Sequence, residues 1–310
     1  MTKPFLTYQQ QLDKLENEKG LLIPDRNIAE QYLKRIGYFA LIGGYKKPFK
    51  NSTTRKYKDN TTFNEIVALY RFDENMRELF LKYMLRIERH IRTLLSYAFV
   101  KKFGENQTAY LDANNYNVTH KNSRRINKLI GEITTILQSN DYPYINYQRT
   151  QYGNVPLWVL VNVLSFGKLS MMYQFLLQAQ QIEISKNFDH INERELQQFL
   201  SVLTKFRNVC AHNERLYSYK TKNSIPDKLL HAKLGIPQRG TEYAAGKNDL
   251  FAVVIIFRYL LSLEEFKAFK SLLDKYIKSF LKETTHITEA DLLHIMGFPI
   301  KWKLITTYKI

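Results

Sequence analysis

The sequence predicts an all-α protein, and three observations support this prediction. Glycine and proline, which interrupt helices, are scarce in this chain of 310 residues, at 12 and 8. Apolar residues recur every three to four positions over residues 63–98, the period of a helix that buries one face. Capping boxes precede two such segments, with Thr62 three positions before Glu65 and Asn192 three positions before Glu195.

Residues 1–60 are expected to form a helical segment packed on the core, with helices over residues 5–18 and 26–36. In the apolar stretch that follows, Gly43 and Gly44 permit a tight turn. A phosphate-binding turn is the alternative, but no strand precedes the glycines and no Walker lysine follows them.

Residues 61–217 are expected to form the helical core. The helix over 63–98 is its central element, and near its end Glu88 and Arg92 are four positions apart, so they are expected to pair on one face. A glutamate in this position can also orient an arginine on a neighbouring helix. The supporting residues of the site are therefore predicted to be Glu88 and Arg92.

A polar connection over 101–121 and a short amphipathic helix over 123–137 follow. Residues 141–154 are predicted to be a tyrosine-rich loop that contains Arg149. Aromatic rings among basic residues can stack on unpaired bases, or they can fix the loop against the core, and both interpretations stay open. A buried helix is then expected from Pro156 to Phe175.

The helix capped at Asn192 carries an inner apolar stripe that leads to Arg207. The stripe consists of Leu196, Phe199, Leu200, Leu203 and Phe206. A rigid, buried helix next to Arg207 is what a preorganised site requires.

Residues 218–310 are predicted to be a basic irregular segment, up to about residue 248, followed by helices packed on the same core. The basic segment is long for a connection, which indicates that it is either functional or mobile, and its basic residues favour contact with RNA. The last helices are expected after the cap Asp249 and over 263–282 and 288–296, and the tail over 302–310 is expected to be a strand or an extended cover.

The net charge of +17 and the isoelectric point near 9.6 favour a polyanionic partner such as nucleic acid. A generally lysine-rich proteome or a membrane surface are the alternatives. Cys210 is the single cysteine, so an internal disulfide is excluded and a reducing cytoplasm is expected. No signal peptide is recognised, the apolar run over 250–263 is too short to cross a membrane, and neither a metal nor a cofactor is expected.

The strongest candidate for chemistry is the segment in which Arg207 and Asn208 precede His212. Metal-free cleavage of RNA needs a group that exchanges protons near neutral pH, and histidine does so with a pKa of about 6.5. It also needs a permanent cation against the charge on the phosphorane oxygens, which the guanidinium group supplies. The same pattern also occurs by chance, as a surface ion pair and a helix cap.

Helix geometry restricts how this segment can act. At about 100° per residue, Arg207 and His212 are about 140° apart on a regular helix, whereas Asn208 and His212 share a face. Either the helix is irregular here, or the arginine side chain reaches around it, or a second protomer completes the site.

Several segments resemble abortive-infection (Abi) proteins of the AbiD/AbiF kind, a phage-defence family of bacteria. The resemblance covers roughly residues 20–220. It is carried by Tyr32 to Phe39, Tyr45 to Phe49, Arg86 to Arg92, Pro156 to Val159, Ser165 to Ser170, and Arg207 to Asn213. The Phe-Gly-Lys-Leu-Ser and Arg-Asn-x-x-x-His segments are the most diagnostic.

The resemblance implies a HEPN-like helical bundle with additional helices and long polar loops, acting as a metal-independent endoribonuclease. It implies a homodimer with facing motifs, products with 2′,3′-cyclic phosphate ends, and restraint by a small structured RNA. Arg207, Asn208 and His212 inherit the catalytic expectation. The expected RNA contacts are Lys205, Arg215, Tyr217 and Arg149. Relatives are expected to have a histidine where this chain has Asn146, so no chemistry is assigned to that segment.

Two other classes of function compete with the nuclease. One is a non-catalytic protein that sequesters RNA, and the other is an interaction module of a defence complex. Salt-dependent RNA binding without products would favour the first. Co-purification with a protein and no binding of RNA would favour the second.

Overall fold

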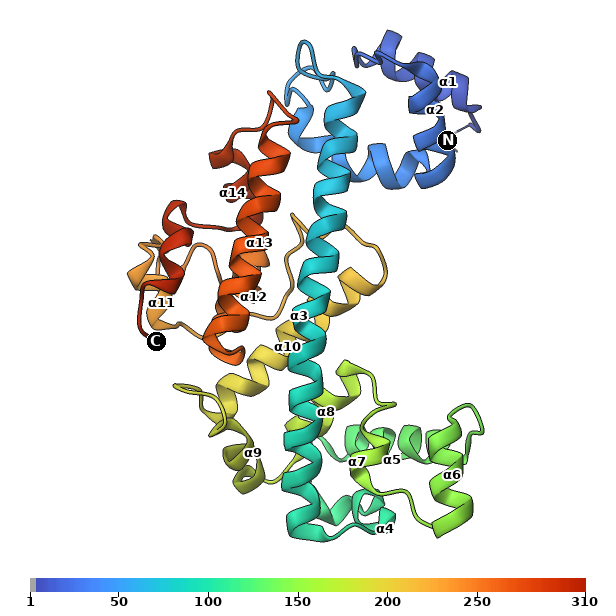
Figure 1. Cartoon of the computed structure of the whole chain (residues 1–310), viewed down its shortest axis with the longest axis vertical. Helices are drawn as coiled ribbons and strands as arrows, with labels where there is room; N and C mark the ends of the chain where they lie inside the picture. Colours follow the sequence, from blue (N-terminus) through green and yellow to red (C-terminus); the bar gives the residue numbers. More distant parts are fainter. Residues whose placement is uncertain (1–3) are drawn as a thin grey trace.

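The computed structural model describes residues 4–310, and nearly all of its regular structure is helical (Figure 1), which confirms the all-α prediction. The α-helices are α1 (Tyr8–Asp13), α2 (Arg26–Ile36), α3 (Phe63–Phe103), α4 (Gln107–Leu111), α5 (Ser123–Gln138), α6 (Pro143–Tyr152), α7 (Leu157–Leu160), α8 (Phe166–Phe175), α9 (Gln178–Ser185), α10 (Glu193–Ala211), α11 (Leu229–Lys233), α12 (Leu250–Leu260), α13 (Leu263–Leu281) and α14 (Glu289–Met296).

Shorter elements complete the fold. They are the π-helical turns Lys14–Glu18 and Phe39–Gly43, the 3-10 turns Lys47–Phe49, Ala113–Asn115 and Ile300–Thr306, and the strands β1 (Gln238–Arg239) and β2 (Glu242–Tyr243). The two strands pair antiparallel, with Gln238 opposite Tyr243.

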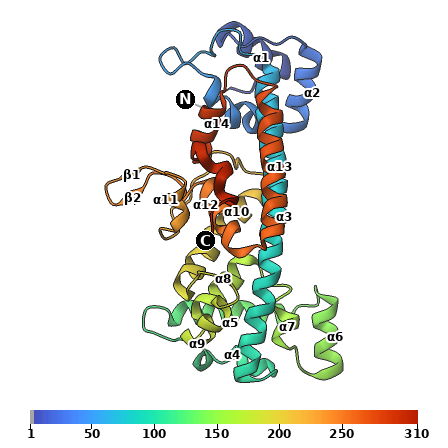
Figure 2. The same ribbon diagram turned by 60° about the vertical axis from the view of Figure 1, so that its left-hand side comes forward.

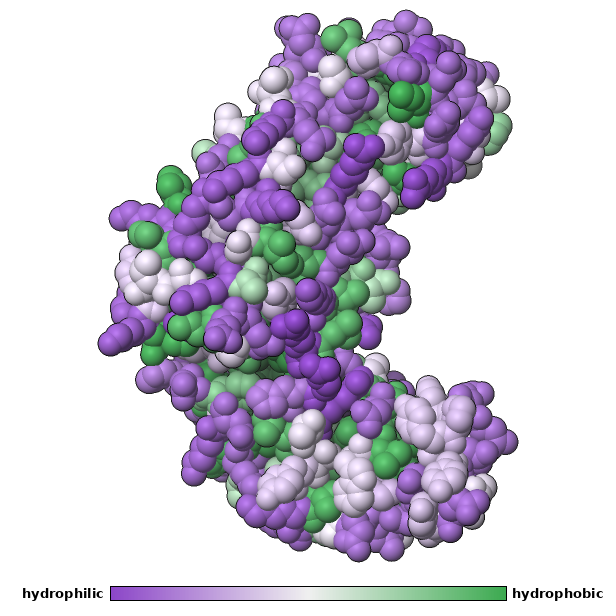
Figure 3. Space-filling model, viewed as in Figure 1, coloured by the Kyte–Doolittle hydropathy of each residue, from purple (hydrophilic) through white to green (hydrophobic). Residues whose placement is uncertain are grey.

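Helix α3 is the axis of the molecule, with 41 residues and a length of about 60 Å. The predicted capping box starts it, since the Thr62 hydroxyl accepts from the backbone N–H of Glu65 and the Glu65 carboxylate accepts from that of Thr62. Helices α10 and α13 pack along α3, and α8 packs on α10 (Figures 1 and 2). The elements before α3 cover one end of it and α4 to α7 gather at the other, so the molecule is hollowed on one side (Figure 3).

One continuous core joins these elements. Its apolar residues come from the N-terminal helices, from α3, α8 and α10, and from the C-terminal helices. All residues of α12 except Arg258 are buried, which agrees with the expected burial of this apolar run. Among the described residues, no helix combines the length and apolarity that a membrane span requires.

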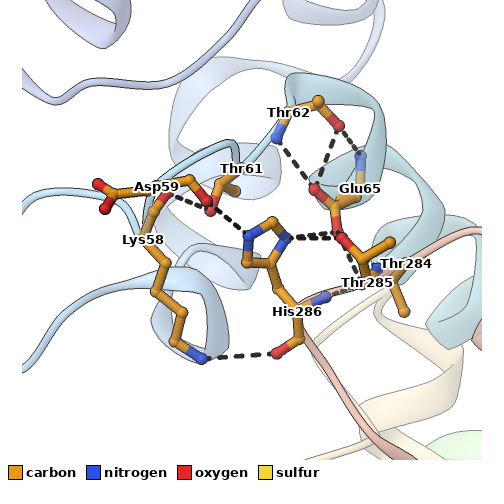
Figure 4. A network of polar contacts seen from close by, with 8 residues as sticks. All are labelled: Lys58, Asp59, Thr61, Thr62, Glu65, Thr284, Thr285 and His286. Carbon is orange, nitrogen blue, oxygen red and sulfur yellow. Dashed lines mark hydrogen bonds and ion pairs between the residues drawn. The ribbon is translucent and has the colours of Figure 1, made fainter.

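A polar network ties the start of α3 to the loop before α14 (Figure 4). One Glu65 oxygen accepts from the backbone N–H of Thr285, at 2.9 Å, and lies 2.8 Å from Nδ1 of His286. The other ring nitrogen of His286 lies 2.8 Å from the carbonyl oxygen of Asp59. Burial would raise the pKa of Glu65, but the hydrogen bonds from His286 and from the backbone lower it to about 2.

Several sequence predictions about local structure were wrong. The predicted polar connection over 101–121 contains the end of α3 and helix α4, and the predicted irregular segment up to about residue 248 contains α11, β1 and β2. The predicted loop over 141–154 contains helix α6, which begins with Pro143 and ends at Gly153 in a left-handed conformation. The predicted helix from Pro156 to Phe175 is interrupted after α7, because Ser165 caps a new helix and accepts from the N–H of Lys168. The tail forms a 3-10 turn that buries Trp302.

Candidate functional site

The candidate site lies at the C-terminal end of α10. This helix starts at the predicted Asn192–Glu195 capping box and stays regular to Ala211. The backbone N–H of His212 donates to the Asn208 carbonyl at 2.9 Å, so the irregular helix considered above is not present. Asn213 then adopts a left-handed conformation with φ 55°, and the N–H of Glu214 donates to the Val209 carbonyl, a Schellman ending.

Arg207 is part of a cluster of three charged side chains between α10 and α3. Its Nε lies 3.7 Å from Oε2 of Glu88. The other carboxylate oxygen of Glu88 accepts from Arg92 at 2.5 Å, so the predicted Glu88–Arg92 pair is present. Arg92 also donates to the Leu164 carbonyl at 2.9 Å, which connects the cluster to the segment before α8.

The cluster has one buried carboxylate and two partly exposed guanidinium groups. Glu88 is 1% exposed, and burial raises its pKa, while the charges of Arg92 and Arg207 act in the opposite direction. Among residues 4–310, the Nε atoms of both arginines and Oε2 of Glu88 are buried without a hydrogen-bond partner. With Glu88 ionised, the cluster carries a net positive charge and retains donors for an anion.

Asn208 and His212 lie on the exposed surface of the same helix end. In the part of the chain that the structure describes, no hydrogen bond or ion pair involves the side chain of either residue. The structure therefore holds Arg207 against α3 and leaves Asn208 and His212 facing solvent, and among the described residues no hydrogen bond joins Arg207 to His212. Within one chain, only the reach of the arginine side chain can bring the two together.

The four expected RNA contacts differ in accessibility. Lys205 is exposed, and Arg215 is exposed while donating to the Gly44 carbonyl at 2.7 Å. Tyr217 is 2% exposed and stacks on Tyr45, so its ring is out of reach of a base in this conformation. Arg149 fixes the end of α5 to α6, because it donates to the Leu137 carbonyl and to the side chains of two asparagines.

Sequence reasoning missed a buried network around Asp73 on α3. The Asp73 carboxylate accepts from the Tyr45 hydroxyl at 2.7 Å and from Arg77 at 2.9 Å. It also accepts from the backbone N–H groups of Leu216 and Tyr217, at 3.0 and 2.6 Å. This network anchors the segment that follows His212. The sequence feature that could have revealed this network is the presence of two charged residues, Asp73 and Arg77, within the apolar stripe of α3.

Comparison with known proteins gives one match. The family model described as Abi-like protein matches residues 31–218, more than half of the chain and including the whole candidate site. No curated protein and no solved structure is detectably similar to the chain. No group of three or more metal-ligating side chains occurs within residues 4–310. The match to the family model shows that this chain belongs to the family of Abi-like proteins.

Proposed function

We propose that this protein acts in phage defence by abortive infection, as a ribonuclease that cuts RNA at the C-terminal end of α10. Membership in the Abi-like family supports the defence role. The observation that carries the nuclease is the geometry of the helix end. A buried carboxylate, Glu88, holds Arg207 there, while Asn208, the next residue, and His212, five residues after Arg207, are exposed.

The proposed reaction is attack of the RNA 2′-hydroxyl on the adjacent phosphorus. The bond from the 2′-oxygen to phosphorus forms, the bond from phosphorus to the 5′-oxygen breaks, and the 2′-hydroxyl proton is matched by a proton delivered to the leaving oxygen. The products are a 2′,3′-cyclic phosphate and a 5′-hydroxyl, and no water is consumed in this step.

Each residue of the motif has a distinct role in this proposal. His212 moves a proton at the attacking 2′-hydroxyl or at the leaving 5′-oxygen, since imidazole exchanges protons near neutral pH. Arg207 stabilises the negative charge of the phosphorane. Asn208 holds the scissile phosphate. Glu88 and Arg92 are positioning residues that fix the guanidinium group of Arg207.

A homodimer is part of the proposal. Arg207 faces α3, and His212 projects about 140° away from it around the helix. Two copies of the motif that face each other across a two-fold axis would place two arginines and two histidines around one phosphate. The net charge of +17 supports RNA as the substrate and also as a restraining partner, such as a small structured RNA.

The test uses purified protein with mixed cellular RNA in the presence of EDTA. We expect cleavage with cyclic phosphate ends, and a loss of about 10²–10⁴-fold in rate for His212→Ala with unchanged RNA affinity. His120→Ala is the matched control, because His120 is an exposed histidine outside the motif. Equal cleavage by His212→Ala would refute the catalytic assignment. Binding without products from the wild type would support the RNA-sequestering alternative.

A further inference from the structure

Helix α3 has a second functional face, opposite the face that holds Arg207. Tyr97 is nine positions after Glu88, which places it about 180° away around the helix. An exposed stripe runs along this outer face at helical spacing, with Arg89, His90, Thr93, Tyr97 and Lys101. In Figure 3, strongly hydrophilic residues gather over the middle of α3, and a paler area lies toward its C-terminal end.

A hollow lies between the C-terminal part of α3 and α7. Its volume is about 540 Å³, within the range of ligand-binding pockets, and it is lined by Thr93, Ser96, Tyr97, Val100, Lys101 and Trp158. Tyr97 is 65% exposed and Trp158 is 48% exposed. Among residues 4–310, neither ring is paired with another aromatic ring, although many other aromatic side chains of this protein are.

The net charge of +17 favours a polyanion over an apolar protein surface as the partner of this hollow. Lys101 borders the hollow and pairs with Glu183 at 2.9 Å. Arg89 lies two turns before Tyr97 and has no ion-pair partner in the described chain, so its charge is available to a phosphate. His90 is also exposed, and it packs edge-on against Phe188. Two aromatic rings that are not paired with other rings, and a cation about two turns away along α3, are elements of a single-strand binding surface.

We infer that this hollow binds an unpaired nucleobase of RNA, stacked on Tyr97 and Trp158, while Arg89 contacts the phosphate backbone nearby. Bases in a duplex are already stacked and cannot enter such a site, whereas bases of single strands, loops and bulges can. The site therefore selects RNA by the presence of unpaired bases. The inference rests on the proposed function only in taking RNA as the ligand.

The fluorescence of Trp158 provides a direct test. The protein has two tryptophans, and Trp302 is fully buried, so Trp158 is the one that a bound base can reach. The probes are a 12-nucleotide 2′-O-methyl oligouridylate and a 2′-O-methyl duplex of the same length. A 2′-O-methyl strand lacks the attacking hydroxyl, so binding is measured independently of cleavage.

We expect the single strand to quench the emission of Trp158 and the duplex to do so much less. Tyr97→Ala should weaken binding by about 5- to 150-fold, the effect of losing one stacked base. Tyr97→Phe, which keeps the ring, should bind like the wild type. Phe5→Ala is the control, because Phe5 is an exposed aromatic residue, 87% accessible, that lies before α1 and outside the hollow.

Three results would overturn the inference. One is unchanged emission at saturating single strand, and another is equal affinity of Tyr97→Ala and Phe5→Ala. The third is a change of oligomeric state in Tyr97→Ala, measured by light scattering, which would assign the hollow to a protein contact. Quenching by a protein that cleaves no RNA would support this site and refute the nuclease. Cleavage of RNA without quenching of Trp158 would support the nuclease and refute this binding site.

Discussion

The buried carboxylate of Asp73 should hold the segment that follows His212, including Leu216 and Tyr217, in its folded conformation. Its two oxygens accept from four donors, three of them at Oδ2 and one at Oδ1. Asp73→Asn keeps the shape of the side chain but replaces one acceptor oxygen with a donor group. Because Asp73 and Arg77 are both buried, the substitution leaves a guanidinium charge without its counter-ion and backbone N–H groups without an acceptor.

The expected cost is about 3–5 kcal/mol, the typical effect of removing one partner of a buried ion pair. Dividing this loss of free energy by the entropy of unfolding expected for a chain of this length gives a decrease of roughly 5–8 °C in the melting temperature. Circular dichroism measures the melting temperature. Hydrogen exchange at Leu216 and Tyr217 measures the local effect, which should appear as faster exchange of these two amides.

Glu78→Gln is the matched control, since Glu78 is exposed on the same helix and has no polar partner among the described residues. Its melting temperature should stay close to that of the wild type. The reasoning is refuted if Asp73→Asn melts like this control, or if it melts lower without faster exchange at Leu216 and Tyr217.

Three further predictions concern a glycine, an ion pair and the arginine of the proposed catalytic motif. Gly297→Ala should destabilise the protein by about 1–3 kcal/mol in urea unfolding, because φ of Gly297 is +79° and the new methyl group would lie 2.2 Å from the Asp249 carboxyl group. Gly131→Ala is the control: this position in α5 has open space around it, so the substitution should stabilise the protein by about 0.5–1 kcal/mol. The stability difference between wild type and His286→Gln should be largest between about pH 4.5 and 6.5. Below this window, the stabilisation by Glu65 is lost as the pH falls toward the lowered pKa of Glu65, about 2. Above the window, the stabilisation by His286 is lost as the pH rises through the raised pKa of His286. A stability difference that is constant with pH would contradict the pairing of the two side chains. Arg207→Lys should reduce the rate of RNA cleavage by about 10²–10³-fold in single-turnover assays, with unchanged affinity for RNA. Lysine keeps the positive charge but lacks the planar, forked guanidinium group. Full activity of this variant would contradict the proposed role of the guanidinium group.

Features that depend on a few neighbouring residues were predictable from the sequence. The caps at Thr62, Asn192 and Asp249 were identified because a side-chain oxygen and a backbone N–H within three residues decide them. The Glu88–Arg92 pair was identified because the spacing of four residues on a helix brings the two side chains together.

Features that depend on distant parts of the chain were not predictable. Helix α6 was missed because it buries only Ile145, so its sequence shows no apolar period, and packing on α5 and α7 stabilises it. The burial of Tyr217 follows from its contact with Tyr45, more than 170 residues earlier. The proximity of Glu88 to Arg207 was considered from the sequence, but only the packing of α10 on α3 specifies it.

The length of α3 has a consequence for its evolution. Glu65, Asp73 and Glu88 each contact a different segment of the chain from one uninterrupted helix, and Tyr97 of the same helix lines the hollow next to α7. Deleting a single residue between Arg77 and Glu88 would turn everything after it by about 100° relative to everything before it. Substitutions in α3 can therefore accumulate one at a time, whereas insertions and deletions in α3 preserve these contacts only in steps close to whole helical turns.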